Sequence, residues 1–371
     1  MKVLFICAEY PLPVKDRRGK RLINIMKQLK KQGHALYFTG FSEKTNPDKN
    51  PLFETLSLYA PTPASGDFRQ HAEPAYKEKI KGEILSLKPD ALFAYGIEAA
   101  RYVPFEAKLP ALADFRRCEY IVLQRENEKS GFLKKLTGAV EWSHIASVET
   151  ALASKFSTVF LPTERDRYYL TKQSTLDITV LPEAIDTEKY DISEWNPDPE
   201  RLLFTGSVME EGNLQAVKNY RDRFGKDFFR RGVSLYVTGK FDEAHKKSVF
   251  CEYVRPMGFM KDIREAYANA QAVVIPISGG IGARGKITEA MACGVPVIST
   301  KDGAEGLRLT GSDECILIAN TPEEMLAAWE KLQDRAYADE LRKNARRFVE
   351  ENYSWNANGI ILADELKRAL K

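Results

Sequence analysis

Residues 280–300 read GIGARGKITEAMACGVPVIST, and this stretch decides how the second half of the chain folds. The apolar run at residues 272–278 comes just before it and predicts a buried strand. The glycines then predict a loop, and residues 286–294 predict a short helix that ends at its glycine. A strand, a glycine-rich loop and a helix N-terminus together form an anion site, because free N–H groups and the helix dipole face the ligand.

The spacing of Gly280, Gly285 and Lys286 is that of a Walker A loop, which is typical of nucleoside triphosphatases. Two features oppose that interpretation. Ile287 stands where a Walker A motif has its Mg²⁺-binding Ser or Thr. No later predicted strand ends in the Asp that would complete the metal site. The sequence therefore favours a different use of the glycines and the lysine.

Glu289 follows Lys286 by nearly one helical turn, so the two side chains share a face of the predicted helix. A cation beside phosphates and a carboxylate one turn deeper fit a nucleoside diphosphate. Lys286, together with Arg284, would balance the diphosphate charge, and Glu289 would accept hydrogen bonds from two ribose hydroxyls. The alternative is a solvated turn with a surface glutamate, and this segment alone leaves that alternative open.

The composition is that of an ordinary globular protein, with 371 residues, 44% hydrophobic and 29% charged, and the length predicts two domains. A net charge of +3 is too small for a general nucleic-acid binder, so no nucleic-acid partner is expected. The five cysteines lack zinc or redox spacing and predict reduced, buried residues of a cytoplasmic protein. No apolar run approaches the length of a membrane span.

Short apolar strands alternate with helical patterns along the whole chain, which predicts parallel sheets covered by helices on both faces. The polar, proline-bearing residues 184–200 interrupt the alternation and predict the domain boundary. The predicted fold class is therefore α/β, with two doubly wound domains and a ligand site in the cleft between them. The predicted strands lie at residues 2–10, 34–41, 90–96, 110–115, 158–162, 177–182, 201–207, 233–240, 251–259, 272–278, 295–300 and 315–320.

Residues 280–300 fit the pattern GxGxRxKxxEAMACGVPVIST, which resembles the donor-site signature of the family 4 retaining glycosyltransferases, also called glycosyltransferase group 1. The resemblance is to the bacterial exopolysaccharide or cell-surface glycan branch, and it covers nearly the whole chain. Further segments that resemble this branch, in order, are PLPVKDRRGKRLINIMKQLKKQGH, LPALADFRRCEYIVLQR, FSTVFLPTERDRYYL, LPEAIDTEKY, LLFTGSVMEEGNLQAV, GFMKDIREAYANAQAVVIP and YSWNANGIILADELKRAL.

This resemblance implies the GT-B fold, in which two Rossmann-like domains face a central cleft. Residues 1–185 would form an acceptor domain, residues 186–354 a nucleotide-sugar donor domain, and a helix at residues 355–371 would pack back on the first domain. The implied activity is that of a retaining, hexosyltransferase-type enzyme. It would move a sugar from a nucleotide-diphosphate sugar to a glycan or lipid-linked acceptor in cell-surface glycan or polysaccharide biosynthesis.

The resemblance also implies roles for individual residues. Catalytic roles fall to Lys286, Arg284 and Asp114, with the cations and nearby N–H groups stabilising the leaving diphosphate. The chain contains no Asp-x-Asp sequence, so neither a metal nor another cofactor is expected. The residues implied in donor binding are Gly19, Gly206, Ser207, Gly280, Ile281, Gly282, Lys286, Thr288 and Glu289.

The chain departs from the family pattern at two places. Ile281 replaces a glutamate, so the backbone amides of residues 279–282 are expected to recognise the sugar. The loop GSVMEEG lacks the usual Arg and Lys, which leaves more of the phosphate charge to Lys286. Two alternatives stay open: a GT-B protein that binds nucleotide sugars without transferase activity, and a nucleotide-sugar epimerase.

Residues 14–33 are rich in Lys and Arg. Leu22, Ile25, Met26 and Leu29 follow helical spacing within them and predict a face that packs on a sheet. The basic residues of Arg17–Lys31 then predict an exposed face. That face is either simply solvated or binds anionic lipid headgroups on the inner surface of the membrane.

Overall fold

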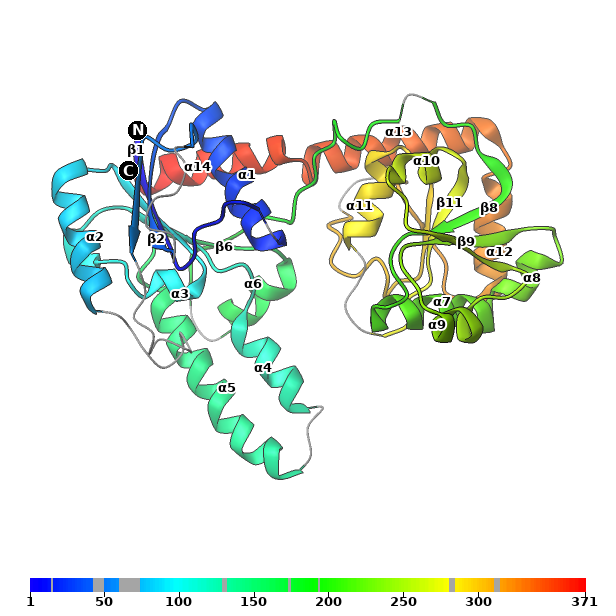
Figure 1. Ribbon diagram of the computed structural model, residues 1–371, viewed down its shortest axis with the longest axis horizontal. Coiled ribbons are helices and arrows are strands. Elements are labelled where there is room, and N and C mark those ends of the chain that lie inside the picture. Colours follow the sequence, from blue (N-terminus) through cyan, green and yellow to red (C-terminus); the bar gives the residue numbers. More distant parts are fainter. Residues whose placement is uncertain are drawn as a thin grey trace. The chain divides into compact units, whose positions relative to one another are not determined.

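The computed structural model describes residues 1–14, 16–42, 50–59, 74–128, 132–172, 175–192, 194–279, 284–309 and 314–371. Residues 125–128, 132–142 and 284 are described only by their backbone. The chain divides into two compact units (Figure 1). Unit 1 comprises Met1–Ala184 and Trp355–Lys371, and unit 2 comprises Ile185–Ser354. Each unit is built around one parallel sheet, which confirms the predicted α/β fold class.

Unit 1 contains a seven-stranded sheet of order β3-β2-β1-β4-β5-β6-β7. The order reverses between β1 and β4, which makes this pair the switch point of a doubly wound sheet. The prediction missed β3, an edge strand whose side chains are mostly half-buried and which lacks a continuous apolar run. The strands are β1 (Lys2–Cys7), β2 (Ala35–Phe41), β3 (Thr55–Tyr59), β4 (Ala91–Tyr95), β5 (Ala111–Asp114), β6 (Thr158–Leu161) and β7 (Ile178–Val180).

Two helices from opposite ends of the chain, α1 and α14, lie side by side in unit 1 (Figure 1). Gln32 Nε2, just after α1, donates a 2.6 Å hydrogen bond to the carbonyl oxygen of Gly359 in α14. The predicted apolar face of α1 is buried. The helices are α1 (Arg17–Lys31), α2 (Pro74–Leu87), α3 (Ile97–Ala100), the 3₁₀ turn η1 (Phe105–Ala107), α4 (Glu119–Glu128), α5 (Phe132–Ala153), α6 (Glu164–Thr171) and α14 (Trp355–Ala369).

Helices α4 and α5 form a hairpin that projects from the rest of unit 1 (Figure 1). Glu149 on α5 is fully buried and accepts hydrogen bonds from the backbone N–H groups of Glu119 (2.9 Å) and Tyr120 (3.2 Å). Burial raises the pKa of the Glu149 carboxyl to about 7. This carboxyl group therefore caps the first turn of α4 and ties the two helices together at the base of the hairpin.

Unit 2 contains a six-stranded parallel sheet of order β10-β9-β8-β11-β12-β13, with its switch point between β8 and β11. Its strands are β8 (Asp198–Phe204), β9 (Ser234–Thr238), β10 (Val254–Gly258), β11 (Ala270–Ile275), β12 (Val297–Ser299) and β13 (Leu317–Ile318). Its helices are α7 (Glu211–Arg223), α8 (Gly225–Phe229), α9 (Glu243–Val249), α10 (Ile263–Ala268), α11 (Arg284–Ala292), α12 (Pro322–Lys331) and α13 (Arg335–Asn352).

The ends of two helices in unit 2 follow directly from local sequence. Helix α12 begins with a capping box, in which the Thr321 side chain and Glu324 satisfy each other's backbone N–H groups and Pro322 takes the first position. Helix α11 ends before Gly294, whose φ of +62° suits a residue without a side chain. These local signals fix the start of α12 and the end of α11.

The described cysteines carry no disulfide, and Cys7, Cys118, Cys293 and Cys315 are buried as predicted. Cys251 differs, because it is only partly buried. Among the helices of the described ranges, none combines the length and the apolar character that a bilayer crossing needs.

Arg21 corrects the prediction that the basic residues of α1 are exposed. Only 2% of this side chain is exposed, and its Nε lies 2.8 Å from Oδ2 of Asp114. Its Nη groups donate to the carbonyl oxygens of Leu181 (2.8 Å) and Pro182 (3.1 Å). Burial by itself lowers the pKa of Arg21, but the Asp114 carboxylate, with smaller contributions from Glu183 and Tyr95, outweighs that effect, so the pKa is raised. The guanidinium thereby joins α1, β5 and the segment after β7.

Asp114 is fully buried at the end of β5, where a carboxylate without partners would be strongly unfavourable. Besides Arg21, it accepts a 2.8 Å hydrogen bond from the backbone N–H of Arg116. The chain buries Arg21 because this carboxylate needs a cation, and sequence spacing within α1 cannot reveal a partner 93 residues away.

We predict that Asp114→Asn lowers the free energy of unfolding by about 3 kcal/mol, because the buried Arg21 charge then loses its closest counter-charge. Urea unfolding followed by circular dichroism measures this change. The control is Glu54→Gln, which breaks the pair between Glu54 and Lys30, whose side chains are 46% and 35% exposed. That exposed pair should contribute less than about 1 kcal/mol. Equal effects of the two substitutions would contradict the prediction.

Candidate functional site

The carboxyl edge of the unit 2 sheet, beside its switch point, is where doubly wound sheets hold their ligands. Strand β8 leads here into a turn that begins with Thr205, Gly206 and Ser207 and enters α7. Strand β11 leads into residues 276–279 and then, beyond residues that the structure does not describe, into α11. The turn and the helix that the sequence singles out therefore follow the two strands of the switch point.

Gly206 and Lys286, two predicted site residues, meet at this edge. Gly206 has a φ of +132°, and a Cβ added to it would stand 2.7 Å from Lys286 Nζ and 2.8 Å from Asn213 Nδ2. The absence of a side chain at Gly206 thus leaves the room in which the ammonium lies. Lys286 Nζ is also 5.6 Å from the ring centroid of Phe204, at the end of β8, within cation–π range.

The turn after β8 is fixed by contacts to the end of β9. The backbone N–H of Gly206 donates to Thr238 Oγ1 at 3.3 Å. The hydroxyl of Ser207, a predicted donor-binding residue, donates a 2.7 Å hydrogen bond to the carbonyl oxygen of Lys240. A Cβ at Gly239 would stand 2.5 Å from the Ser207 nitrogen, so the two loops touch backbone to backbone. These contacts within the protein therefore fix the shape of the turn.

The loop after β11 is held by polar side chains from two other elements. The Asn219 amide of α7 donates to the carbonyl oxygen of Pro276 at 2.6 Å. The Asp302 carboxylate accepts a 2.6 Å hydrogen bond from the backbone N–H of Gly279. That N–H was expected among the amides that recognise the sugar, and in this structure it anchors the start of the glycine-rich loop.

Glu289, on α11, accepts a hydrogen bond from Tyr190, which lies in unit 2 in the segment before β8. Burial, followed by the Glu289 charge and this hydrogen bond, raises the pKa of Tyr190. Burial also raises the pKa of the Cys293 thiol to about 12, with a second contribution from Glu289. The side chain of Glu289 is half-buried. It is oriented by Tyr190, which was not among the predicted site residues.

Other predicted residues are placed less completely. Gly280, Ile281 and Gly282 lie outside the described residues, and only the backbone of Arg284 is described. Thr288 is buried and its hydroxyl donates to the Gly285 carbonyl oxygen at 3.2 Å. Their roles stay predictions.

Gly19 and Asp114 belong to unit 1. The N–H of Gly19 donates to Asp16 Oδ1 at 2.9 Å, which caps α1, and a Cβ at Gly19 would lie 3.3 Å from the Pro11 carbonyl oxygen. Asp114 is the buried partner of Arg21 described above. Their contacts are those of a helix cap and an internal ion pair, and the roles predicted for them stay predictions.

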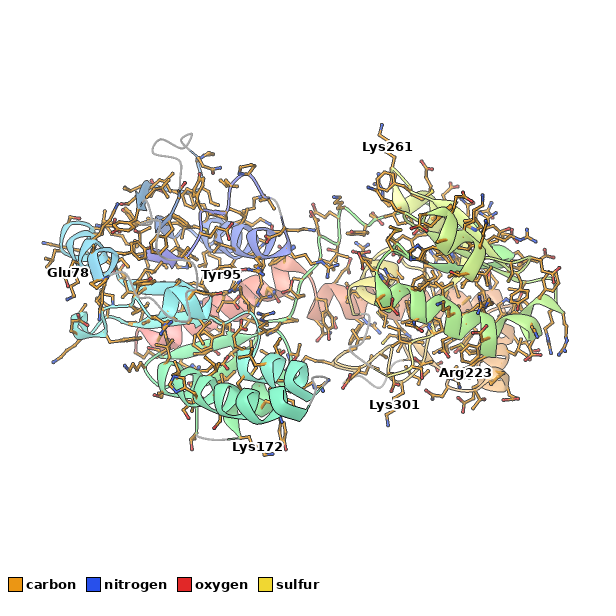
Figure 2. All side chains as sticks on the ribbon, turned by 60° about the horizontal axis from the view of Figure 1, so that its bottom comes forward. Glu78, Tyr95, Lys172, Arg223, Lys261 and Lys301 are labelled. Carbon is orange, nitrogen blue, oxygen red and sulfur yellow. The ribbon has the colours of Figure 1, made fainter. Side chains whose placement is uncertain are left out.

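Three exposed lysines follow strands of the unit 2 sheet at the same edge, namely Lys240 after β9, Lys261 after β10 and Lys301 after β12. Figure 2 shows Lys261 and Lys301 reaching outward. Asp242, Asp262 and Asp302 follow these lysines within two residues, so the three cations do not by themselves make the edge positive. None of the three was predicted as a site residue, although Lys240 ends a predicted strand and Lys261 and Lys301 closely follow one.

Among the described residues, no three His, Cys, Asp or Glu side chains lie close enough together to hold a metal ion. The predicted cation that the described side chains place at this edge is the Lys286 ammonium.

The segment that contains this edge matches a known protein family. Residues 199–335 match the family model described as "Glycosyl transferases group 1". The match includes the turn after β8, α7 and α11. None of the curated protein sequences matches the chain.

Several solved structures share the fold over the whole chain. Sucrose-phosphate synthase from Thermosynechococcus elongatus is 15% identical, with a TM-score of 0.65, over 99% of this chain and 98% of that chain. Anabaena Alr3699/HepE in complex with UDP is 15% identical, with a TM-score of 0.64, over 99% and 100%. WaaG, a glycosyltransferase involved in lipopolysaccharide biosynthesis, is 16% identical, with a TM-score of 0.57, over 98% and 99%. The predicted GT-B fold is confirmed.

We predict that Gly206→Ala lowers the free energy of unfolding by about 2 kcal/mol, because a φ of +132° is strained for alanine and its methyl group must push Lys286 aside. Gly212→Ala is the matched control. Gly212 lies in the first turn of α7 with no atom within 4 Å of an added Cβ, so alanine there should stabilise by up to about 1 kcal/mol. Thermal and urea unfolding of both variants would test the contrast, and equal stabilities would refute it.

Proposed function

We propose that this chain is a glycosyltransferase that moves a sugar from a nucleotide-diphosphate sugar to an acceptor hydroxyl. The observation that carries the proposal is the Lys286 ammonium, which lies against Gly206 at the β8/β11 switch point. Support comes from the group 1 match over the same residues and from the likeness to Anabaena HepE, whose structures hold UDP and UDP-glucose. We further propose family 4, its bacterial cell-surface glycan branch, and a hexosyltransferase-type reaction.

In the proposed reaction the bond between the sugar's anomeric carbon and the diphosphate breaks, and a bond to the acceptor oxygen forms on the same face. Because the new bond forms on the face that the diphosphate leaves, the configuration is retained. The acceptor's proton passes to the departing phosphate oxygen, so the charges balance. Lys286, Arg284 and the N–H groups at the start of α11 would stabilise the negative charge that grows on the leaving diphosphate. Glu289, held by Tyr190, would accept hydrogen bonds from the ribose. We propose that no metal or other cofactor takes part.

The contacts of Asp114 support an indirect role in this reaction. Its carboxylate is fully buried and faces Arg21 and the N–H of Arg116, so it would act by holding the end of β5 in shape. We propose that unit 1 binds the acceptor, a glycan or a lipid-linked sugar, and that the enzyme works in the cytoplasm.

We predict that one or more of UDP, GDP, ADP and dTDP raises the melting temperature of the protein, since a ligand that binds only the folded state stabilises it. Lys286→Ala should lower the affinity for that nucleotide by about tenfold. It should also slow turnover of the matching nucleotide sugar roughly a hundredfold. Lys331→Ala is the control, because Lys331 also lies over an aromatic ring of unit 2, 5.9 Å from the Tyr337 centroid, but on α12.

Each other outcome of this experiment has a definite meaning. If no nucleoside diphosphate binds, the proposal fails. If one binds but the protein neither hydrolyses the nucleotide sugar nor transfers its sugar, the chain is a binding protein. If the sugar is isomerised and stays on the nucleotide, the chain is an epimerase.

We also propose that α1 contacts an anionic membrane surface. With Arg21 buried and Lys30 paired with Glu54, the exposed basic residues that share one helical face are Arg17, Lys20, Lys27 and Lys31. Their spacing of three, seven and four residues keeps them on that face. Basic residues near an anionic bilayer attract it by about 1 kcal/mol each.

We predict that the protein sediments with vesicles of phosphatidylcholine containing about 30% phosphatidylglycerol more than with phosphatidylcholine alone. Lys20→Glu with Lys27→Glu should abolish the difference, because both charges on the exposed face are reversed. The control reverses Lys246 and Lys247, two basic residues of α9 in unit 2. Equal sedimentation with both vesicle types would overturn this part of the proposal.

A further inference from the structure

We propose that Asn213 is a positioning residue of the anion site: its side-chain amide holds two acceptor oxygens of the turn after β8 away from a bound diphosphate. This inference rests on the function proposed above. Asn213 lies in the first turn of α7 and is 7% exposed. Burial of a carboxamide requires partners for its polar atoms, and the partners found here show what it does.

The Asn213 Nδ2 group donates to two oxygens. It lies 2.8 Å from the carbonyl oxygen of Ser207 and 3.2 Å from Oε2 of Glu210. An amide nitrogen has two hydrogens to donate, so both are engaged within the turn. Asn213 is therefore not itself a ligand for phosphate through this nitrogen, and it acts through the turn.

The same nitrogen borders the space beside Gly206. A Cβ at Gly206 would stand 2.8 Å from Asn213 Nδ2 and 2.7 Å from Lys286 Nζ, so the amide and the ammonium flank one face of the glycine. The Ser207 carbonyl and the Glu210 carboxylate are thus held by an amide that borders the same glycine as the ammonium. Both are electron-rich, and either would repel a phosphate if it turned toward it.

Glu210 makes this restraint necessary. The loop from Gly206 to Gly212 carries two glutamates and no cation, and Glu210 is the N-cap residue of α7 without a side-chain capping hydrogen bond. Its carboxylate is instead held by the Asn213 amide. An uncharged amide at position 213 donates to the Glu210 carboxylate and adds no negative charge. A carboxylate at position 213 would add one.

The experiment compares two ligands, the tightest binder among UDP, GDP, ADP and dTDP and the nucleoside that lacks its phosphates. Asn213→Asp should lower the affinity for the diphosphate by roughly tenfold or more, because a carboxylate beside Lys286 pairs with the ammonium and repels phosphate. Affinity for the nucleoside should change less than about twofold. Calorimetric titration measures both. Asn352→Asp is the control, since Asn352 also donates to a backbone carbonyl in unit 2, that of Phe348 at 2.9 Å.

A second comparison tests whether Asn213 acts through Glu210 and remains valid if Asn213→Asp does not fold. Asn213→Ala should weaken the diphosphate several-fold, and adding Glu210→Gln should restore most of that loss. Glu210→Gln alone should change the affinity for the diphosphate less than Asn213→Ala does. Such coupling between the two substitutions is a result that a merely structural role of Asn213 does not produce.

Equal weakening of diphosphate and nucleoside, or independent effects of the two substitutions, would overturn the inference and leave the proposed function intact. If the unchanged protein binds none of the four diphosphates, the proposed function fails first and the inference fails with it. The two failures are therefore distinguished by the unchanged protein alone.

Discussion

The close approach of the Lys286 ammonium to Gly206 is the contact on which the rest of the site depends. It joins the turn after β8 to α11, the helix that follows β11. The order of the strands in the unit 2 sheet reverses between β8 and β11. A side chain at Gly206 would fill the place of the ammonium, and its φ of +132° suits glycine. Hydrogen bonds from neighbouring loops then fix the turn so that the cation meets a rigid backbone.

The two sheets have the same winding but treat charge differently at their carboxyl edges. In unit 1 the Arg21 guanidinium and the Asp114 carboxylate neutralise each other inside the domain, where neither is exposed. In unit 2 lysines follow three of the strands and stay exposed. A buried, neutralised pair stabilises and orients the elements around it, whereas exposed cations can attract an anion from solution. The Lys286 ammonium beside Gly206 places the candidate anion site in unit 2.

Much of the fold could be predicted from sequence because its signals are local. Central strands such as β1, β4 and β11 are buried on both faces and therefore read as continuous apolar runs. Edge strand β3 is half-exposed and gives no such run, which is why the prediction missed it. Arg21 was wrongly predicted to be exposed for a related reason. The helical pattern shows which apolar positions face the sheet, but it does not show that a buried carboxylate, that of Asp114, lies beside Arg21.

The sequence by itself determined the two α/β domains, the glycine-rich loop followed by a helix, and the placing of Lys286 and Glu289 on that helix, because each follows from neighbours within a few residues. Only the tertiary structure decided that Gly206 lies against Lys286, that Asn213 and Asn219 hold the two loops, and that Tyr190 orients Glu289. Most of these contacts join residues dozens of positions apart. Their partners depend on strand order and on where each strand ends, and periodicity along the chain specifies neither.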